Sequence, residues 1–115
     1  MTVSNRRIAV LSPVAWRTPP RQYGAWETVA GNIAEGLAAR GWDVTLFATG
    51  DSVTRARLHA VVDRGYEEDP AIDPKVAEYL HISEAFELGG VLERLGDMHV
   101  FGDFGIDGGI FFIPP

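Results

Sequence analysis

The chain has 115 residues, and with 46% hydrophobic residues it can bury the core of one domain. It contains no cysteine, which excludes disulfides, thiolate metal sites and cysteine nucleophiles. A formal net charge of −6 argues against nucleic acid as a partner, and the apolar runs are too short for a membrane span or a signal peptide, so we expect a soluble cytoplasmic protein.

The first half of the chain predicts a strand, a long loop, a helix and a second strand. The apolar run at residues 7–12 predicts a buried strand, and the polar residues 13–24 form a loop longer than the roughly two to six residues usual before a helix. Residues 25–40 have helical periodicity, and residues 43–48 are predicted as the second strand. The predicted apolar stripe of the helix consists of Trp26, Val29, Ile33 and Leu37.

The second half predicts one more helix and several short strands. Residues 57–62 are predicted as a third strand, and Asp73 with Pro74 supplies the cap and first residue of a helix that ends at Gly89 and Gly90. We expect His81 to be a surface or edge residue of this helix. The predicted buried face of the helix consists of Val76, Tyr79, Ile82 and Phe86. Residues 98–104 and 110–113 are predicted as short strands.

This order of elements predicts an α/β fold. Strand, helix and strand make a βαβ unit, so we expect a Rossmann-like open parallel sheet with flanking helices in a single domain over residues 1–90. Residues 91–115 form a glycine-rich, divergent tail that either completes the sheet or makes an interface. The apolar run at 110–113 resembles an edge strand, which favours a homodimer slightly over completion of the chain's own sheet.

The carboxyl edge of the predicted sheet is the expected ligand site, because open α/β sheets bind ligands there. Arg17 and Arg21 lie in the loop before the helix that starts at Gly24, and a helix N-terminus with added positive charge favours a phosphate. The alternative is that Gly24 is only a turn residue. Glu27 would repel an anion if it pointed inward, and its more usual role is to complement the helix dipole or to pair with a loop arginine.

Two further side chains at this edge have both a structural and a binding interpretation. Asp51 follows the second strand, where a ribose-binding carboxylate can lie, but an acid in a Gly-Asp-Ser turn is usually structural. Trp16 is a candidate platform for stacking on a sugar, whereas Trp26 is expected in the core.

Other chemistries have little support in the sequence. The glycine fingerprint of dinucleotide-binding proteins is missing from residues 24–31, which leaves a dinucleotide-dependent oxidoreductase fragment as a minor alternative. His59, His81 and His99 lack metal-ligand spacing, and no Ser-His-Asp order is evident. We therefore expect neither a metal nor a cofactor.

Three segments are informative when they are taken together: Arg-Ile-Ala-Val-Leu-Ser-Pro at 7–13, Tyr-Gly-Ala-Trp-Glu at 23–27, and Arg-Gly-Trp-Asp-Val-Thr-Leu-Phe-Ala-Thr-Gly-Asp-Ser at 40–52. They resemble the N-terminal domain of the retaining glycosyltransferase family 4 (group 1), which has the GT-B fold. The resemblance covers residues 6 to about 88. It implies a two-domain enzyme with its active site in the cleft between the domains, and the N-terminal domain of such an enzyme mainly holds the acceptor.

The resemblance also implies roles for particular residues. Tyr23, Gly24 and Ala25 would approach the diphosphate of a nucleotide-sugar donor, although family members often carry a second glycine where this chain has Ala25. His99 stands where a His-x-His-like motif is usual, which makes it the candidate catalytic residue. The implied ligands are a nucleotide-sugar and a sugar or lipid acceptor.

After Gly90 the sequence departs from the family and nothing matches its second domain, so we expect a truncated or split enzyme that is inactive alone. The alternative is a non-catalytic Rossmann-like module that dimerises or binds another protein.

Overall fold

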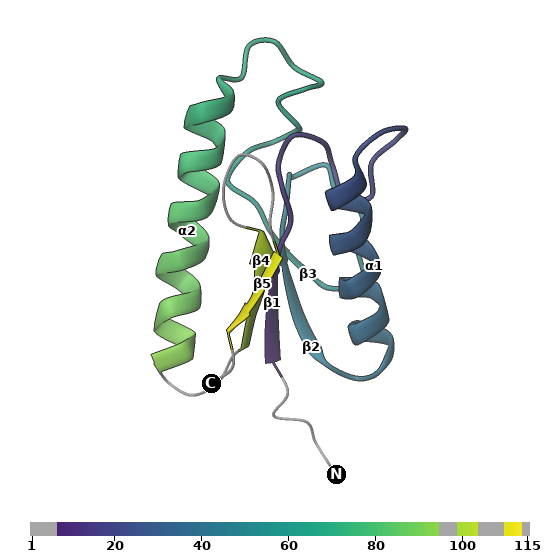
Figure 1. Ribbon diagram of the computed structural model, residues 1–115, viewed down its shortest axis with the longest axis vertical. Coiled ribbons are helices and arrows are strands. Elements are labelled where there is room, and N and C mark those ends of the chain that lie inside the picture. Colours follow the sequence, from purple (N-terminus) through teal and green to yellow (C-terminus); the bar gives the residue numbers. More distant parts are fainter. Residues whose placement is uncertain (1–6, 95–98, 104–109, 114–115) are drawn as a thin grey trace.

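One five-stranded sheet with two helices organises the computed structural model, which describes residues 7–94, 99–103 and 110–113 (Figure 1). The elements in chain order are β1 (Arg7–Leu11), α1 (Ala25–Ala39), β2 (Asp43–Phe47), β3 (Arg57–His59), α2 (Pro74–Arg94), β4 (His99–Asp103) and β5 (Ile110–Ile113). The chain is therefore a small mixed α/β fold. The predicted third strand is shorter than expected, since β3 ends at His59.

The strand order is β3-β2-β1-β4-β5. β1 pairs in parallel with β2 on one side and β4 on the other, which confirms that the first two strands of the chain are neighbours. β2 also pairs in parallel with β3, but β5 is antiparallel to β4, so the prediction of a wholly parallel sheet is wrong for this strand. Residues 104–109 are too few for the crossover of about a dozen residues that a parallel neighbour requires.

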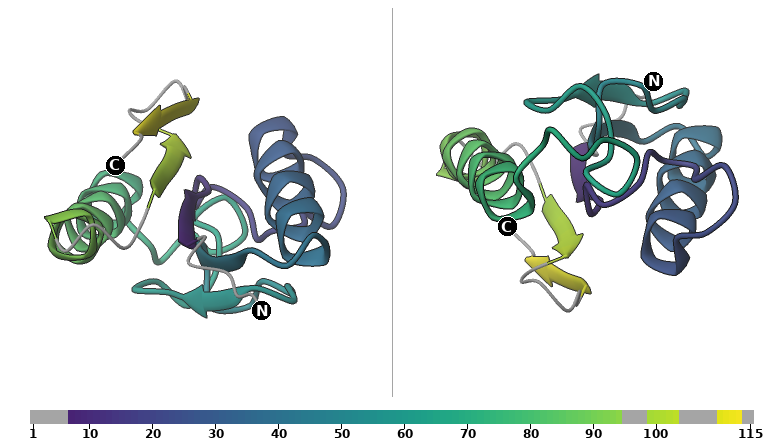
Figure 2. Two further views of the ribbon diagram at one scale, coloured as in Figure 1. Left: turned by 90° about the horizontal axis from the view of Figure 1, so that it is seen from below. Right: turned by 90° about the horizontal axis from the view of Figure 1, so that it is seen from above.

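The two helices cover opposite faces of the sheet (Figure 2). Side chains alternate along a strand, so Ile8 and Val10 of β1 pack in the cluster that includes α1. Ala9 and Leu11 point the other way and pack with Ala85 of α2. β1 is thus buried on both faces, as its continuous apolar run predicts.

The buried face of α1 differs from the predicted stripe. Trp26 and Val29 are 44% and 39% exposed, and the helix turns its small residues toward the sheet instead. Ile33 and Leu37 remain half-buried against the core, as expected. The most buried positions of the helix are Glu27, Ala30, Gly31 and Ala34. Small side chains bring the helix axis close to its neighbours, and the ideal Cβ position of Gly31 is only 3.0 Å from Thr18 Cγ2.

The second helix begins as predicted but ends later and buries other residues. The Asp73 carboxylate accepts hydrogen bonds from the backbone N–H groups of Lys75 (2.9 Å) and Val76 (3.3 Å), which confirms the cap. The expected end at Gly89 and Gly90 is wrong, because α2 continues to Arg94. Glycine lowers helix propensity by only about 1 kcal/mol per residue, so two glycines need not end a helix.

Among the described side chains of α2, the buried ones are Ala77, His81 and Ala85, each four residues apart. Val76 and Tyr79, predicted to be buried, are 53% and 71% exposed, while Ile82 is half-buried. Phe86 lies outside the described side chains. In both helices, the described residues that are buried against the sheet include alanines rather than the predicted large apolar side chains.

The segment after residue 90 continues the same sheet. The expected boundary at residue 90 lies inside α2, and β4 then pairs with the central strand β1. Within the described residues, 99–103 and 110–113 extend the sheet by two strands.

Candidate functional site

Three connections meet at the carboxyl edge of the parallel strands. They are residues 12–24 after β1, residues 48–56 after β2, and residues 60–73 after β3. Each starts at the upper end of the molecule in Figure 1, and the second then returns to the start of β3. The sequence predicts a ligand site at this edge, and the structure shows how the long first loop is held there.

Thr18 anchors the loop after β1. Its hydroxyl hydrogen-bonds the Ser12 hydroxyl (2.7 Å), and its backbone N–H donates to Ser52 Oγ (2.9 Å). Its carbonyl accepts from the backbone N–H of Val53 (2.9 Å). Because Thr18 is fully buried, these bonds satisfy groups that would otherwise be costly to bury, and they fix the loop to the turn after β2.

A second anchor joins this loop to the segment after β3. The backbone N–H groups of Tyr66 and Glu67 donate to the carbonyls of Val14 (3.1 Å) and Ala15 (3.0 Å). Gly65 makes this approach close, because a Cβ there would lie 2.4 Å from the Ala15 carbonyl oxygen. The Tyr66 hydroxyl donates to Glu78 on α2 (3.2 Å), and burial together with this carboxylate raises the pKa of Tyr66 to about 12.

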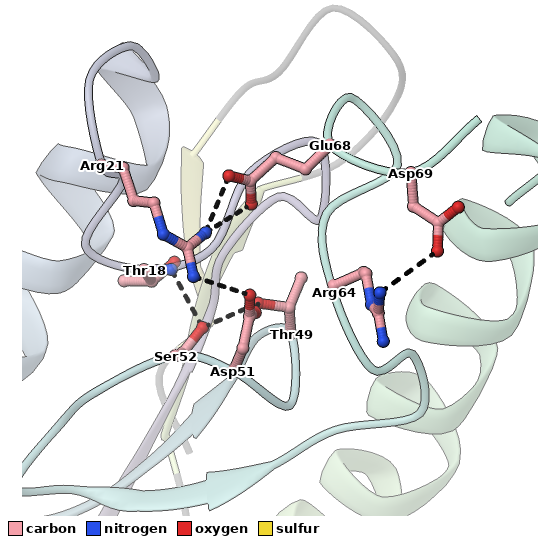
Figure 3. A network of polar contacts seen from close by, with 8 residues as sticks. All are labelled: Thr18, Arg21, Thr49, Asp51, Ser52, Arg64, Glu68 and Asp69. Carbon is pink, nitrogen blue, oxygen red and sulfur yellow. Dashed lines mark hydrogen bonds and ion pairs between the residues drawn. The ribbon is translucent and has the colours of Figure 1, made fainter. Parts of the chain in front are cut away.

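Arg21 links all three connections through its guanidinium group (Figure 3). Its Nη1 donates to both carboxylate oxygens of Glu68, at 2.9 and 2.7 Å, and its Nη2 lies 3.7 Å from Asp51. Asp51 also accepts a hydrogen bond from the Thr49 hydroxyl (2.6 Å). Asp51 therefore supports its own turn and at the same time faces the loop arginine.

A polar hollow of about 350 Å³ opens between these connections. Its lining consists of Arg21, Asp51, Asp63, Arg64 and Glu68. Arg64 also pairs with Asp69, at 3.7 Å. The arrangement offers carboxylate acceptors and guanidinium donors side by side, so it is suited to a ligand that both donates and accepts hydrogen bonds.

The start of α1 is a separate feature, and a carboxylate occupies it. Glu27 is only 3% exposed and accepts a hydrogen bond from the backbone N–H of Trp16 (3.1 Å). Its Oε1 would be 2.9 Å from a Cβ placed on Gly24, which caps the helix with a φ of 148° and no side-chain bond. An inward carboxylate complements the helix dipole, and the same charge opposes an anion at this glycine.

The other residues that the sequence predicts for the binding site differ from one another in exposure and in contacts. Tyr23 is 72% exposed, and its ring packs edge-on against Trp16 with a centroid distance of 6.3 Å. Ala25 is the exposed first residue of α1. Arg17 is half-buried, and its Nε atom is buried without a hydrogen-bond partner. The structure thus brings Arg21 and Asp51 together but not Arg17, Tyr23 or Ala25 with them.

His81 is buried, not on the surface as predicted. It is 4% exposed, and its Nε2–H donates to the Ser12 carbonyl at 2.6 Å. Burial lowers the pKa of His81 to about 4, with a smaller contribution in the same direction from His59, although the Ser12 bond acts the other way. A neutral imidazole therefore ties α2 to the end of β1. Its spacing of four from Ala77 and Ala85 is the signal that identifies its face.

His99 lies away from the carboxyl edge. It is the first residue of β4 and pairs in register with Ile8, near the start of β1, whereas the candidate site lies beyond the strand ends. In the part of the chain that the structure describes, no group of three or more His, Asp or Glu side chains could hold a metal.

Asp63, Arg64 and Glu68 are the hollow residues that sequence reasoning missed. They belong to an acidic, turn-rich segment without apolar periodicity, so no pattern places it beside the first loop. The only signal for the contact is Gly65, whose close backbone approach becomes evident in the fold.

Neither protein-family models nor the sequences of curated proteins give a match to this chain. Among the described helices, none combines the length and apolar character needed to cross a membrane.

Proposed function

We propose that this chain is the acceptor-side domain of a retaining, nucleotide-sugar-dependent glycosyltransferase with a Rossmann-like N-terminal GT-B domain. The observation that carries the proposal is the polar hollow at the carboxyl edge, formed by Arg21, Asp51 and the segment 63–68. Ligands of open α/β sheets bind at this edge, and the first loop is long and firmly held there.

The resemblance at residues 7–13, 23–27 and 40–52 supports the enzyme class. The first and third of these segments form β1 and β2, the two central parallel strands that carry the site at their ends. The middle segment forms the start of α1, where Glu27 closes the helix terminus. A donor diphosphate could approach Tyr23, Gly24 and Ala25 only if Glu27 moved or lost its charge. The proposal therefore rests on binding of the acceptor and not on binding of the donor.

The test is sugar transfer. The purified chain is assayed with UDP-, GDP- and ADP-sugars, alone and mixed with the product of a neighbouring reading frame that encodes a C-terminal GT-B domain, where there is one. We expect turnover only in the mixture, because a retaining transferase of this kind needs two domains to bring donor and acceptor together. Turnover by the chain alone that is lost when Gly24 is replaced would contradict the need for a second domain. Silence of every mixture would contradict the proposal.

A second candidate function is a non-catalytic module that binds another protein. It is favoured by exposed apolar side chains on the first turns of α2, where Val76, Tyr79 and Leu80 are 53%, 71% and 46% exposed. A stable complex with a protein partner that forms through this face, without any sugar binding, would favour the module over the enzyme.

A further inference from the structure

The hollow at the carboxyl edge has a charge pattern that discriminates between classes of acceptor. Its five lining residues carry three carboxylates, from Asp51, Asp63 and Glu68, and two guanidinium groups, from Arg21 and Arg64. The lining is therefore negative on balance, which disfavours an anionic ligand.

Both arginines already face carboxylates. Arg21 donates to Glu68 and lies 3.7 Å from Asp51, while Arg64 lies 3.7 Å from Asp69 (Figure 3). An anion such as a phosphate would have to displace one of these carboxylates and would then remain close to it. The pairs are partly exposed, with Arg21 51% and Glu68 22% accessible, so a ligand can reach them without unfolding the loop.

A neutral polyhydroxylated ligand is not repelled by the negative lining and need not displace a carboxylate from an arginine. Each carboxylate oxygen keeps a lone pair beyond its present partner, and a guanidinium group has five N–H donors, of which Arg21 uses only part. A sugar hydroxyl both donates and accepts, so it can join this network without breaking an ion pair. The volume of about 350 Å³ falls at the lower end of the roughly 300–1,000 Å³ of small-molecule sites.

We infer that this hollow binds a neutral sugar, and not a sugar phosphate or a lipid phosphate, as the acceptor. That this sugar is the acceptor of a transferase rests on the proposed function. Arg21, Asp63 and Glu68 are its binding residues. The bonds that anchor the first loop do not use the Asp63 side chain, so a substitution of that side chain leaves these anchors in place.

Titration of the chain followed by backbone amide NMR tests the inference. The neutral probes are the methyl glycosides of glucose, mannose and galactose, and the anionic probe is glucose 1-phosphate. We expect a neutral glycoside to shift the amides of residues 21, 51 and 63–68 at high millimolar concentration. Asp63→Asn should weaken that binding about tenfold, because a hydrogen bond to a charged acceptor becomes one to a neutral amide.

The matched control is Glu67→Gln, which removes the same charge from an exposed residue outside the hollow. It should leave neutral-sugar binding unchanged. Asp63→Asn should also strengthen the binding of glucose 1-phosphate relative to the neutral glycosides.

The outcomes separate this inference from the proposed function. If glucose 1-phosphate shifts the same amides at lower concentration than any neutral glycoside, the preference for a neutral acceptor is wrong, while the transferase assay can still succeed. If no sugar of either kind shifts these amides, the hollow is not an acceptor site. An equal effect of Glu67→Gln and Asp63→Asn would show that only overall charge matters, which also overturns it.

Discussion

At the scale of single residues, His81 links stability to pH. Its pKa is about 4 in the folded chain and about 6.5 when unfolded, so between these values the unfolded chain binds more protons. The stabilising contribution is complete above pH 6.5 and is lost as the pH falls toward 4. The shift corresponds to about 3 kcal/mol of unfolding free energy across this window.

Urea unfolding of the parent chain and of the His81→Gln variant at several pH values measures this pH-dependent contribution to the free energy of unfolding. Glutamine keeps a donor for the Ser12 carbonyl but does not titrate, and the other histidines are common to both chains, so their effects cancel in the difference. We expect the advantage of the parent over the variant to shrink by about 2–3 kcal/mol between pH 7 and pH 4.5. Parallel pH profiles would show that His81 is not buried as a neutral group.

Two glycines should respond to alanine in opposite directions. A methyl group at Gly65 would lie 2.4 Å from the Ala15 carbonyl oxygen and 2.7 Å from Trp16 Cα, both of which are backbone atoms that cannot yield easily. We expect Gly65→Ala to lower the free energy of unfolding by about 1–3 kcal/mol. The nearest atom to a methyl group at Gly36, on α1, is the flexible end of Arg40 at 3.4 Å.

Gly36→Ala is therefore the matched control, and it should raise stability by about 0.5–1 kcal/mol through helix propensity. Thermal melting of both variants measures the contrast. If both shifted the melting temperature in the same direction, the close contact between residues 65 and 15 would not exist in solution.

At the scale of elements, α1 packs on the sheet through alanine. The sequence had instead predicted that large apolar residues such as Val29 form its buried face. Ala34 is fully buried between the helix and the sheet, whereas Val29 is 39% exposed. We expect Ala34→Asp to cost several kcal/mol, about 3 or more, because it buries an unpaired charge. Val29→Asp should cost less than about 1 kcal/mol. Equal melting temperatures of the two variants would contradict the orientation of the helix.

The elements that the sequence predicts well are those with one dominant signal. The apolar runs that form β1 and β2 and the Asp73–Pro74 cap lie where expected, because burial on both faces and a capping carboxylate each leave a local mark. The buried faces of the two helices are harder to predict from the sequence. Apolar periodicity selects large residues such as Trp26 and Tyr79, but close approach to the sheet selects alanine and glycine, which have little weight in such a pattern.

The candidate site was predictable only in part, because it depends on contacts between distant segments. Arg21 and Asp51 follow from the rule that ligands bind at the carboxyl edge, and the fold brings them within 3.7 Å. Asp63 and Glu68 join them from a segment without periodicity. Which way Glu27 points also depends on tertiary packing, since it accepts a hydrogen bond from the backbone N–H of Trp16, which lies in the loop before α1.

At the scale of the whole molecule, β5 forms one edge of the sheet. It pairs antiparallel with β4 of its own chain, so the sheet has β5 at one edge and β3 at the other. The side of β5 opposite β4 has no strand neighbour among the described residues, and two copies can pair there across a two-fold axis. The structure therefore shows the alternative to the expected pairing between copies, because this segment completes the sheet of its own chain. A homodimer through the outer edge of β5 stays a prediction, in which both copies would keep their own five strands.

Light scattering at high micromolar concentration should therefore give the mass of two chains. Phe112→Lys places a charge on the β5 edge and should shift the mass to one chain, because lysine on an edge strand opposes edge-to-edge pairing. Leu58→Lys is the control, since Leu58 is an exposed residue of β3 at the opposite edge, and that variant should remain dimeric. A parent chain of monomeric mass whose β5 amides are nonetheless protected from hydrogen exchange would show that β5 serves only its own sheet.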